Sequence, residues 1–161
     1  MDAVLTDEEI AKLIEEPKLL PPNYRSRLQL RPKRGRNERH LDVHGKDGGE
    51  YRIIASQSTS NPLAFSVILT YKVPRSNRLF RLRRYNGKSH EHSNRIEQQT
   101  FYDYHIHLAT ERYQQLGMRE DSYAEATDRF ADLESALNCL VADCRFELPT
   151  DGTLRLFGEG K

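Results

Sequence analysis

Four of the six histidines in this chain fall into two His-x-His pairs, His90 with His92 and His105 with His107. On an extended strand, side chains two residues apart point to the same face. Each pair, if extended, therefore directs two imidazoles to one place. Imidazole titrates near neutral pH, so such a group can exchange protons with a substrate, and it is also a common metal ligand.

Acid–base chemistry is the first hypothesis, because arginines and tyrosines lie close to the histidines in the sequence. This combination suits metal-independent cleavage of RNA: one side chain activates the 2′-hydroxyl, a histidine protonates the leaving oxygen, and arginine stabilises the charged phosphorane. Asp103 shares a strand face with His105 and His107, so its carboxylate would orient an imidazole and raise its pKa. The alternative is a set of ordinary half-buried histidines. The predicted catalytic residues are His105 and His107 as the acid–base pair, with His90, His92 and Asp103.

A cupin-like metal site is a further hypothesis. A glutamate follows each pair, Glu97 after His92 and Glu111 after His107. Histidine and carboxylate together are typical metal ligands. The flanking glycines of the cupin motif are missing, however, and a polar stretch separates the two pairs. We therefore expect no bound metal and no cofactor.

Charge is unevenly distributed, although the net charge is only +1. Residues 72–96 contain eight basic residues and one acidic residue, whereas the chain from 97 onward is acidic. In LFRLRRY (79–85), alternation places Arg81, Arg83 and Tyr85 on one exposed face, which suits phosphate contact and base stacking. A solvated strand face paired with acidic helices is the alternative. The predicted nucleic-acid-binding residues are Arg81, Arg83, Arg84, Tyr85 and Lys88, together with Arg34 and Arg36 of the basic loop PKRGRN.

Local patterns predict the elements that position these side chains. Thr6 and Glu9 form a capping box for a helix that ends near Pro17. Asp132, or the residue just before it, begins a second helix that runs to about Cys144. A short helical segment is expected before Gly117. Residues 88–100 show no clear period and predict a loop. Alternation predicts strands at 27–31, 38–45, 50–58, 64–73, 79–87 and 101–108.

The expected architecture is a single α+β domain over residues 1–161. An antiparallel sheet of about five or six strands would carry an N-terminal and a C-terminal helix packed on it. The strands at 79–87 and 101–108 should be neighbours. The last dozen residues should form a loosely held tail, with a short strand at 153–157. No apolar run is long enough to span a membrane and the N-terminus lacks a signal-peptide pattern, so we expect a cytoplasmic protein without a membrane partner.

The segment 79–146 resembles an uncharacterised bacterial family that shares the blocks RYNGKSHEH and FYDxHIH. It is more distantly similar to the TumE-type toxins of toxin–antitoxin systems. Those proteins have an Arg-Tyr-Asp-Asn block, a histidine pair, a later His-x-His, and a closing helix that starts with Asp-Leu. Here Arg84-Tyr85-Asn86 lacks the aspartate, and the N-terminal half is longer. The resemblance implies a toxin with an antitoxin or other protein partner.

These observations predict a nucleic-acid-directed, toxin-like or defence-associated protein, and specifically a metal-independent ribonuclease. RNA or another nucleic acid would be its partner. The alternative is a non-enzymatic binding or inhibitor module of a phage or mobile element. Such a module would be indifferent to single histidine substitutions and sensitive to charge reversal along the basic strand.

Overall fold

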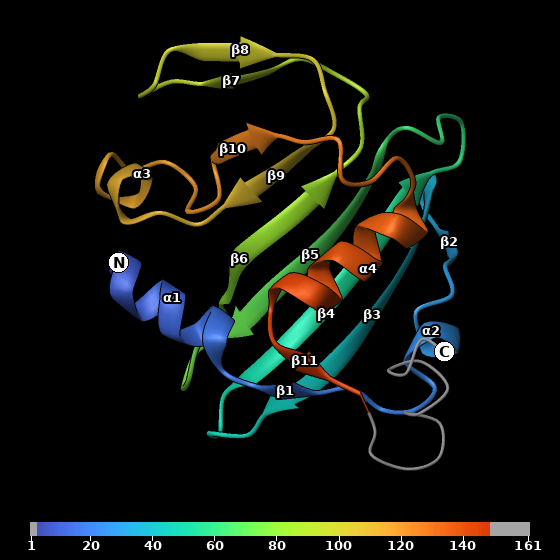
Figure 1. Cartoon of the computed structure of the whole chain (residues 1–161), viewed down its shortest axis with the longest axis vertical. Helices are drawn as coiled ribbons and strands as arrows, with labels where there is room; N and C mark the ends of the chain where they lie inside the picture. Colours follow the sequence, from blue (N-terminus) through green and yellow to red (C-terminus); the bar gives the residue numbers. More distant parts are fainter. Residues whose placement is uncertain (1–2, 149–161) are drawn as a thin grey trace.

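A large, curved and mostly antiparallel sheet forms the body of the molecule (Figure 1). The computed structural model describes residues 3–148. The helices are α1 (Asp7–Glu15), α2 (Tyr24–Arg27), α3 (Glu111–Gln115) and α4 (Leu133–Asp143). The strands are β1 (Lys18–Leu19), β2 (Arg31–Lys33), β3 (Arg36–Gly45), β4 (Glu50–Ser58), β5 (Phe65–Lys72), β6 (Leu79–Asn86), β7 (His92–Asn94), β8 (Gln99–Phe101), β9 (His105–Leu108), β10 (Tyr123–Ala126) and β11 (Phe146–Glu147).

The main sheet runs in the order β10-β9-β6-β5-β4-β3-β1-β11, and β2 pairs with β3 outside this path. Among the strands of residues 3–148, only the β1–β11 pair is parallel. The hairpin β7–β8 forms a separate small sheet beyond β10 (Figure 1). The α+β class with helices on a predominantly antiparallel sheet is thus confirmed, but the sheet has nine strands rather than five or six.

Local capping signals determine where the two predicted helices begin. The Thr6 hydroxyl accepts a hydrogen bond from Glu9 N at 3.0 Å, and the Glu9 carboxylate accepts one from Thr6 N at 2.9 Å. The Asp132 carboxylate accepts a hydrogen bond from Ser135 N at 2.8 Å and begins α4. Both helix starts are confirmed, because each cap satisfies backbone N–H groups that the helix cannot.

The core lies between α4 and one face of the sheet. Leu137 and Leu140 of α4 are buried in one cluster with Val67 and Leu69 of β5. Figure 1 shows α4 crossing this face of the central strands. The strand residues that alternate with these core residues point to the other face of the sheet, which is largely polar. The histidines of β9 belong to that polar face.

A bulge in β6 changes which arginines share a face. Thr70 pairs with Arg81 and Leu69 pairs with Arg83, so Leu82 is an extra residue without a partner on β5. After the bulge the alternation is reversed. Arg84 therefore lies on the same face as Arg81. The prediction that Arg83 shares the face of Arg81 is wrong.

Two segments differ from their predicted structure. Residues 27–31 are not a strand: the chain is helical at Tyr24–Arg27, and Leu28 is buried in the core before β2 begins. Residues 88–100 are not simply a loop, because they contain β7 and most of β8. The turn of this hairpin places Gln98 at φ 55. In both places tertiary contacts outweigh a weak local pattern.

None of the helices within residues 3–148 is long and apolar enough to cross a membrane. The predicted tail and the predicted strand at 153–157 lie outside the described residues.

Candidate functional site: a histidine and arginine pocket

Strands β6 and β9 are direct neighbours, as predicted. Their antiparallel register places Arg84 opposite His107 and Asn86 opposite His105. Directly opposed residues share a face of the sheet. The last part of the basic strand and the second histidine pair therefore form one continuous surface.

The β7–β8 hairpin folds over this surface and adds a third histidine. The ring centroid of His92 lies 5.3 Å from that of His105, in a stacked arrangement, and 4.9 Å from that of His107. Asn94 of the same hairpin holds the outer edge of β10, because its side chain exchanges two hydrogen bonds with the backbone of Ala124. The polar stretch that separates the two histidine pairs in the sequence thus does not keep them apart in the structure. We call His92, His105 and His107 the histidine cluster.

Burial changes the chemistry that the second pair can perform. His105 is 0% exposed and His107 is 5% exposed. Burial lowers the pKa of His105 to about 4, and the neighbouring imidazoles and Arg84 act in the same direction. Burial and the Arg84 charge lower the pKa of His107 to about 2. Both rings are therefore neutral at pH 7, so neither can be the protonated general acid that the acid–base hypothesis requires.

Asp103 does not have its predicted role. Its side chain lies in an exposed position, and its backbone carbonyl, rather than its carboxylate, accepts a hydrogen bond from His105 Nδ1 at 2.7 Å. The strand β9 begins only at His105, so the extended alternation from residue 101 that would align the carboxylate with the imidazoles does not exist.

A pocket of about 280 Å³ opens beside the histidine cluster. Asp121 is buried at its base, and its carboxylate lies 3.0 Å from Arg84 Nε and 3.7 Å from Arg119 Nε. Arg95 has no ion-pair partner within residues 3–148. The lining residues therefore include three guanidinium groups and one carboxylate, an excess of positive charge that makes the pocket attractive to anions. The lining residues are Arg84, Asn86, His90, His92, Ser93, Arg95, His107, Met118, Arg119, Asp121 and Ser122.

The predicted phosphate-binding strand is divided between the two faces of the sheet. Arg81 lies near the pocket and forms an ion pair with Glu120 at 3.2 Å. Arg83 and Tyr85 face the core instead. Tyr85 is 0% exposed, and its hydroxyl donates a hydrogen bond to Asp143 at 2.7 Å. Tyr85 cannot stack on a nucleic-acid base, so that part of the prediction is wrong.

The remaining predicted residues differ in their distance from the pocket. His90 is exposed and lines it. Lys88 is half-buried after β6 and is not among the lining residues. Arg34 and Arg36 lie at the turn between β2 and β3, and β4, β5 and β6 separate β3 from β9. The structure therefore does not bring these two arginines to the histidines.

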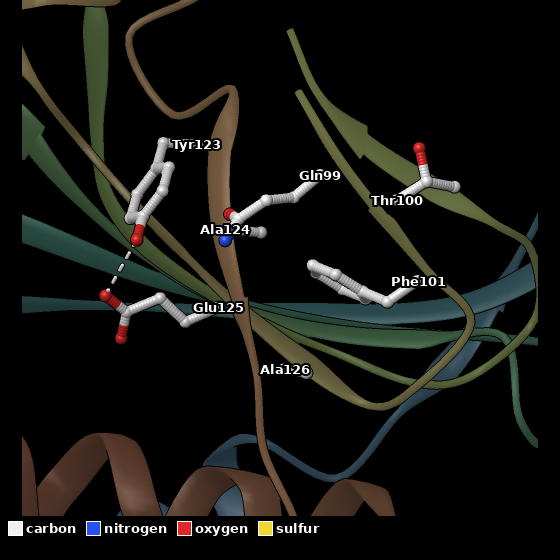
Figure 2. Close-up of a pocket in the computed structure, with 7 residues that line it drawn as sticks. All are labelled: Gln99, Thr100, Phe101, Tyr123, Ala124, Glu125 and Ala126. Carbon is white, nitrogen blue, oxygen red and sulfur yellow. Dashed lines mark hydrogen bonds between the residues drawn. The ribbon is translucent and has the colours of Figure 1, made fainter. Parts of the chain in front are cut away.

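A second groove, of about 480 Å³, runs between β8 and the edge strand β10. Figure 2 shows Phe101 extending from the hairpin toward β10, where Ala124 and Ala126 leave room for it. The Phe101 ring also lies close to the histidine cluster, with a centroid distance of 5.4 Å to the ring of His92. Phe101 therefore borders both the groove and the histidine cluster.

Sequence patterns did not indicate several residues of the pocket. Arg119 and Asp121 belong to REDSY, a segment without periodicity, and they reach the site only because β10 pairs with β9. Asn94 and Arg95 lie in the segment predicted as a loop. His92-Ser93-Asn94 is polar throughout, so no local pattern indicates β7.

Comparisons with known proteins return no match: no family model, curated protein or solved structure is similar to this chain. The proposed relationship to TumE-type toxins accordingly stays a prediction. The function has to be argued from the pocket itself.

Proposed function

We propose that the pocket binds the phosphate groups of a nucleic acid and cleaves RNA, which would make the protein a nucleic-acid-directed toxin-like or defence-associated enzyme. The observation that carries this proposal is the convergence of Arg84, Arg95 and Arg119 on one open pocket beside imidazoles. Guanidinium groups match the geometry and charge of phosphate, and they stabilise the additional charge of a phosphorane.

The roles of the histidines differ from those first expected. His105 and His107 are enclosed and neutral, so the proton-transfer role falls to His90, which is exposed at the pocket. The metal-independent mechanism built on His105 and His107 is therefore not retained. For base stacking, Phe101 replaces the buried Tyr85, because its ring borders both the histidine cluster and the groove along β10.

Binding and cleavage of a labelled single-stranded RNA test this proposal. Arg95→Gln should weaken binding about three- to tenfold and reduce the salt dependence by about one phosphate contact. Arg31→Gln is the matched control, since Arg31 is also exposed but lies on β2, away from the pocket. His90→Ala should abolish cleavage while binding persists. Absence of RNA binding by the wild-type protein, or equal effects of the two arginine variants, would contradict the proposal.

A non-enzymatic binding module is the second candidate, and the β2–β3 hairpin favours it. Arg31, Lys33, Arg34 and Arg36 are all exposed there, and Glu38 forms ion pairs with only Lys33 and Arg36 among them. This candidate predicts binding without cleavage. Charge reversal by Arg34→Glu would then abolish binding, and Arg95→Gln would leave it unchanged.

A further inference from the structure

The histidine cluster brings three nitrogen ligands close to one point. One ligand atom from each of His92, His105 and His107 lies within 4.8 Å of the other two. Two of the residues come from alternate positions of β9, which point to one face, and the third comes from β7 above that face. Proximity alone does not define a metal site, so the hydrogen bonds that fix the free nitrogen of each ring decide what the cluster can bind.

Backbone carbonyls determine the tautomers of the two buried rings. His105 Nδ1 lies 2.7 Å from the carbonyl oxygen of Asp103, and His107 Nδ1 lies 2.7 Å from that of Asp121. A carbonyl oxygen can only accept a hydrogen bond, so each Nδ1 carries the proton. The Nε2 atom of each of these two histidines is therefore the nitrogen left free to coordinate a metal.

The third ring is oriented through Asn94. The Asn94 amide donates from Nδ2 to Ala124 O at 2.7 Å, and its Oδ1 accepts from Ala124 N at 2.9 Å. These two bonds exclude the flipped amide. His92 Nε2 lies 2.7 Å from the same Oδ1, so Nε2 must be the protonated nitrogen. The lone pair of His92 is consequently on Nδ1.

Each of the three rings thus keeps one nitrogen that makes none of these hydrogen bonds. His105 Nε2 is buried and has no hydrogen-bond partner within residues 3–148, and the same is true of Asn86 Oδ1 on the opposing strand. A buried acceptor without a partner is costly, and native structures satisfy nearly all such groups. We propose that the histidine cluster binds one divalent transition metal of the zinc class through His105 Nε2, His107 Nε2 and His92 Nδ1.

The surroundings suit this assignment. Metal-bound histidines commonly donate their other N–H to a carbonyl or a polar side chain, and all three rings do so here. Tetrahedral zinc with bonds of about 2.0–2.1 Å requires nitrogens about 3.4 Å apart. Because the ligand atoms lie within 4.8 Å of one another, the rings need to move inward to reach this spacing. The positive charge of Arg84 would repel a metal cation bound here. This repulsion is offset because the Arg84 guanidinium forms an ion pair with Asp121 at 3.0 Å.

Three protein ligands leave a fourth position open, and three-histidine sites of this kind activate water or a substrate oxygen. His92 and His107 also line the arginine pocket, so that position is accessible to an anion held there. The inference replaces the sequence-based expectation that the chain binds no metal. It does not depend on which anion is the substrate.

Metal binding is tested on tag-free full-length protein in the absence of RNA. Titration with Zn²⁺, and with Co²⁺ followed by its visible absorption, should give about one ion per chain and a tetrahedral cobalt spectrum. His92→Gln should weaken binding at least tenfold. His44→Gln is the matched control, because His44 is an exposed histidine on β3 and should bind the metal like the wild type.

His105→Gln provides the second variant, and thermal unfolding of each metal-free protein shows whether it is folded. Wild-type protein that is folded but binds no stoichiometric metal at pH 7 would overturn the inference. Binding that is equally weakened by the His44 and His92 variants would overturn it as well. Because Arg95 is not a ligand, the RNA-binding experiment can fail or succeed independently of this one.

Discussion

Two clusters of buried polar side chains in this protein differ in how completely their hydrogen bonds are satisfied. At the start of the sheet, fully buried Lys18 donates to the carbonyl oxygens of Ile14, Glu16 and Cys144, each at 2.9 Å. At the other end, buried His105 has a nitrogen without a partner within residues 3–148. The first arrangement uses every proton of the ammonium group, whereas the second leaves an acceptor open.

We interpret this difference as one between a buried polar cluster that stabilises the fold, at Lys18, and one that is open to a ligand, at the histidines. The Lys18 ammonium joins the ends of α1 and α4 to β1, and the nearby Glu16 carboxylate accepts hydrogen bonds from Tyr51 Oη and from two backbone N–H groups of the β3–β4 turn. Such a satisfied network stabilises one conformation. The histidine cluster has the opposite character: one hydrogen bond orients each ring, and the other nitrogen of each ring is available to a ligand.

The largest effect is expected at Lys18. Lys18→Met removes the donor for three buried carbonyl groups and the charge that faces Glu16, so the free energy of unfolding should fall by about 3–5 kcal/mol. Urea unfolding at pH 7 measures this loss. Lys12→Met is the control, because Lys12 is exposed and should change the free energy by no more than about 0.5 kcal/mol. A loss at Lys18 below about 1 kcal/mol would remove the basis of the comparison.

The second prediction concerns pH and the Glu16 carboxyl. Its burial opposes ionisation, but hydrogen bonds from Tyr51 and from the backbone N–H groups of Gly49 and Asp47 outweigh this, so the pKa of Glu16 lies below its usual 4.5. The unfolded chain therefore takes up this proton more readily than the folded protein. The stabilisation is complete above about pH 4.5 and is lost as the pH falls through the lower folded pKa.

Glu16→Gln should isolate this contribution. At pH 7 the variant should be less stable than the wild type by roughly 1–3 kcal/mol, since the charged acceptor of three hydrogen bonds is lost. The two unfolding free energies should converge as the pH falls below 4.5. Glu15→Gln, at an exposed neighbouring position, should follow the wild-type curve. A difference that stays constant with pH would assign the effect to packing rather than to ionisation.

The sequence predicted best those elements that local chemistry determines. Thr6 and Asp132 each cap a helix through hydrogen bonds with a residue three positions further along the chain. These capping patterns can therefore be recognised without knowledge of the rest of the fold. The strands β3 to β6 alternate over eight to ten residues, which made them recognisable. The short strands β1, β2, β7, β8, β10 and β11 have two to four residues and exist because neighbouring strands offer them hydrogen bonds.

For the candidate site, sequence reasoning identified the histidines and Arg84, but not Arg95, Arg119 or the arrangement of the pocket. A single extra residue, Leu82, moves Arg83 and Tyr85 into the core and leaves Arg81 with Arg84 on the polar face. The sequence LFRLRRY does not predict this bulge, because the bulge arises from the pairing register between β6 and β5. The burial of His105 likewise depends on a hairpin that packs over it, and burial is what converts a proton-transfer group into a neutral ligand.

The smallest change in stability is expected at His92. This substitution tests most directly whether the histidine cluster differs from the Lys18 network. Without metal, His92→Gln should lower the free energy of unfolding by no more than about 1 kcal/mol, because this half-buried ring makes one hydrogen bond, to Asn94. With zinc at about one hundred times its dissociation constant, the wild type should gain about 2.7 kcal/mol and the variant far less. Thermal unfolding of both proteins, with and without zinc, measures the two effects together. If His92→Gln instead proves as destabilising as Lys18→Met and zinc adds nothing to the wild type, the histidine cluster is a structural network like that of Lys18. The open lone pair of His105 would then have no functional meaning.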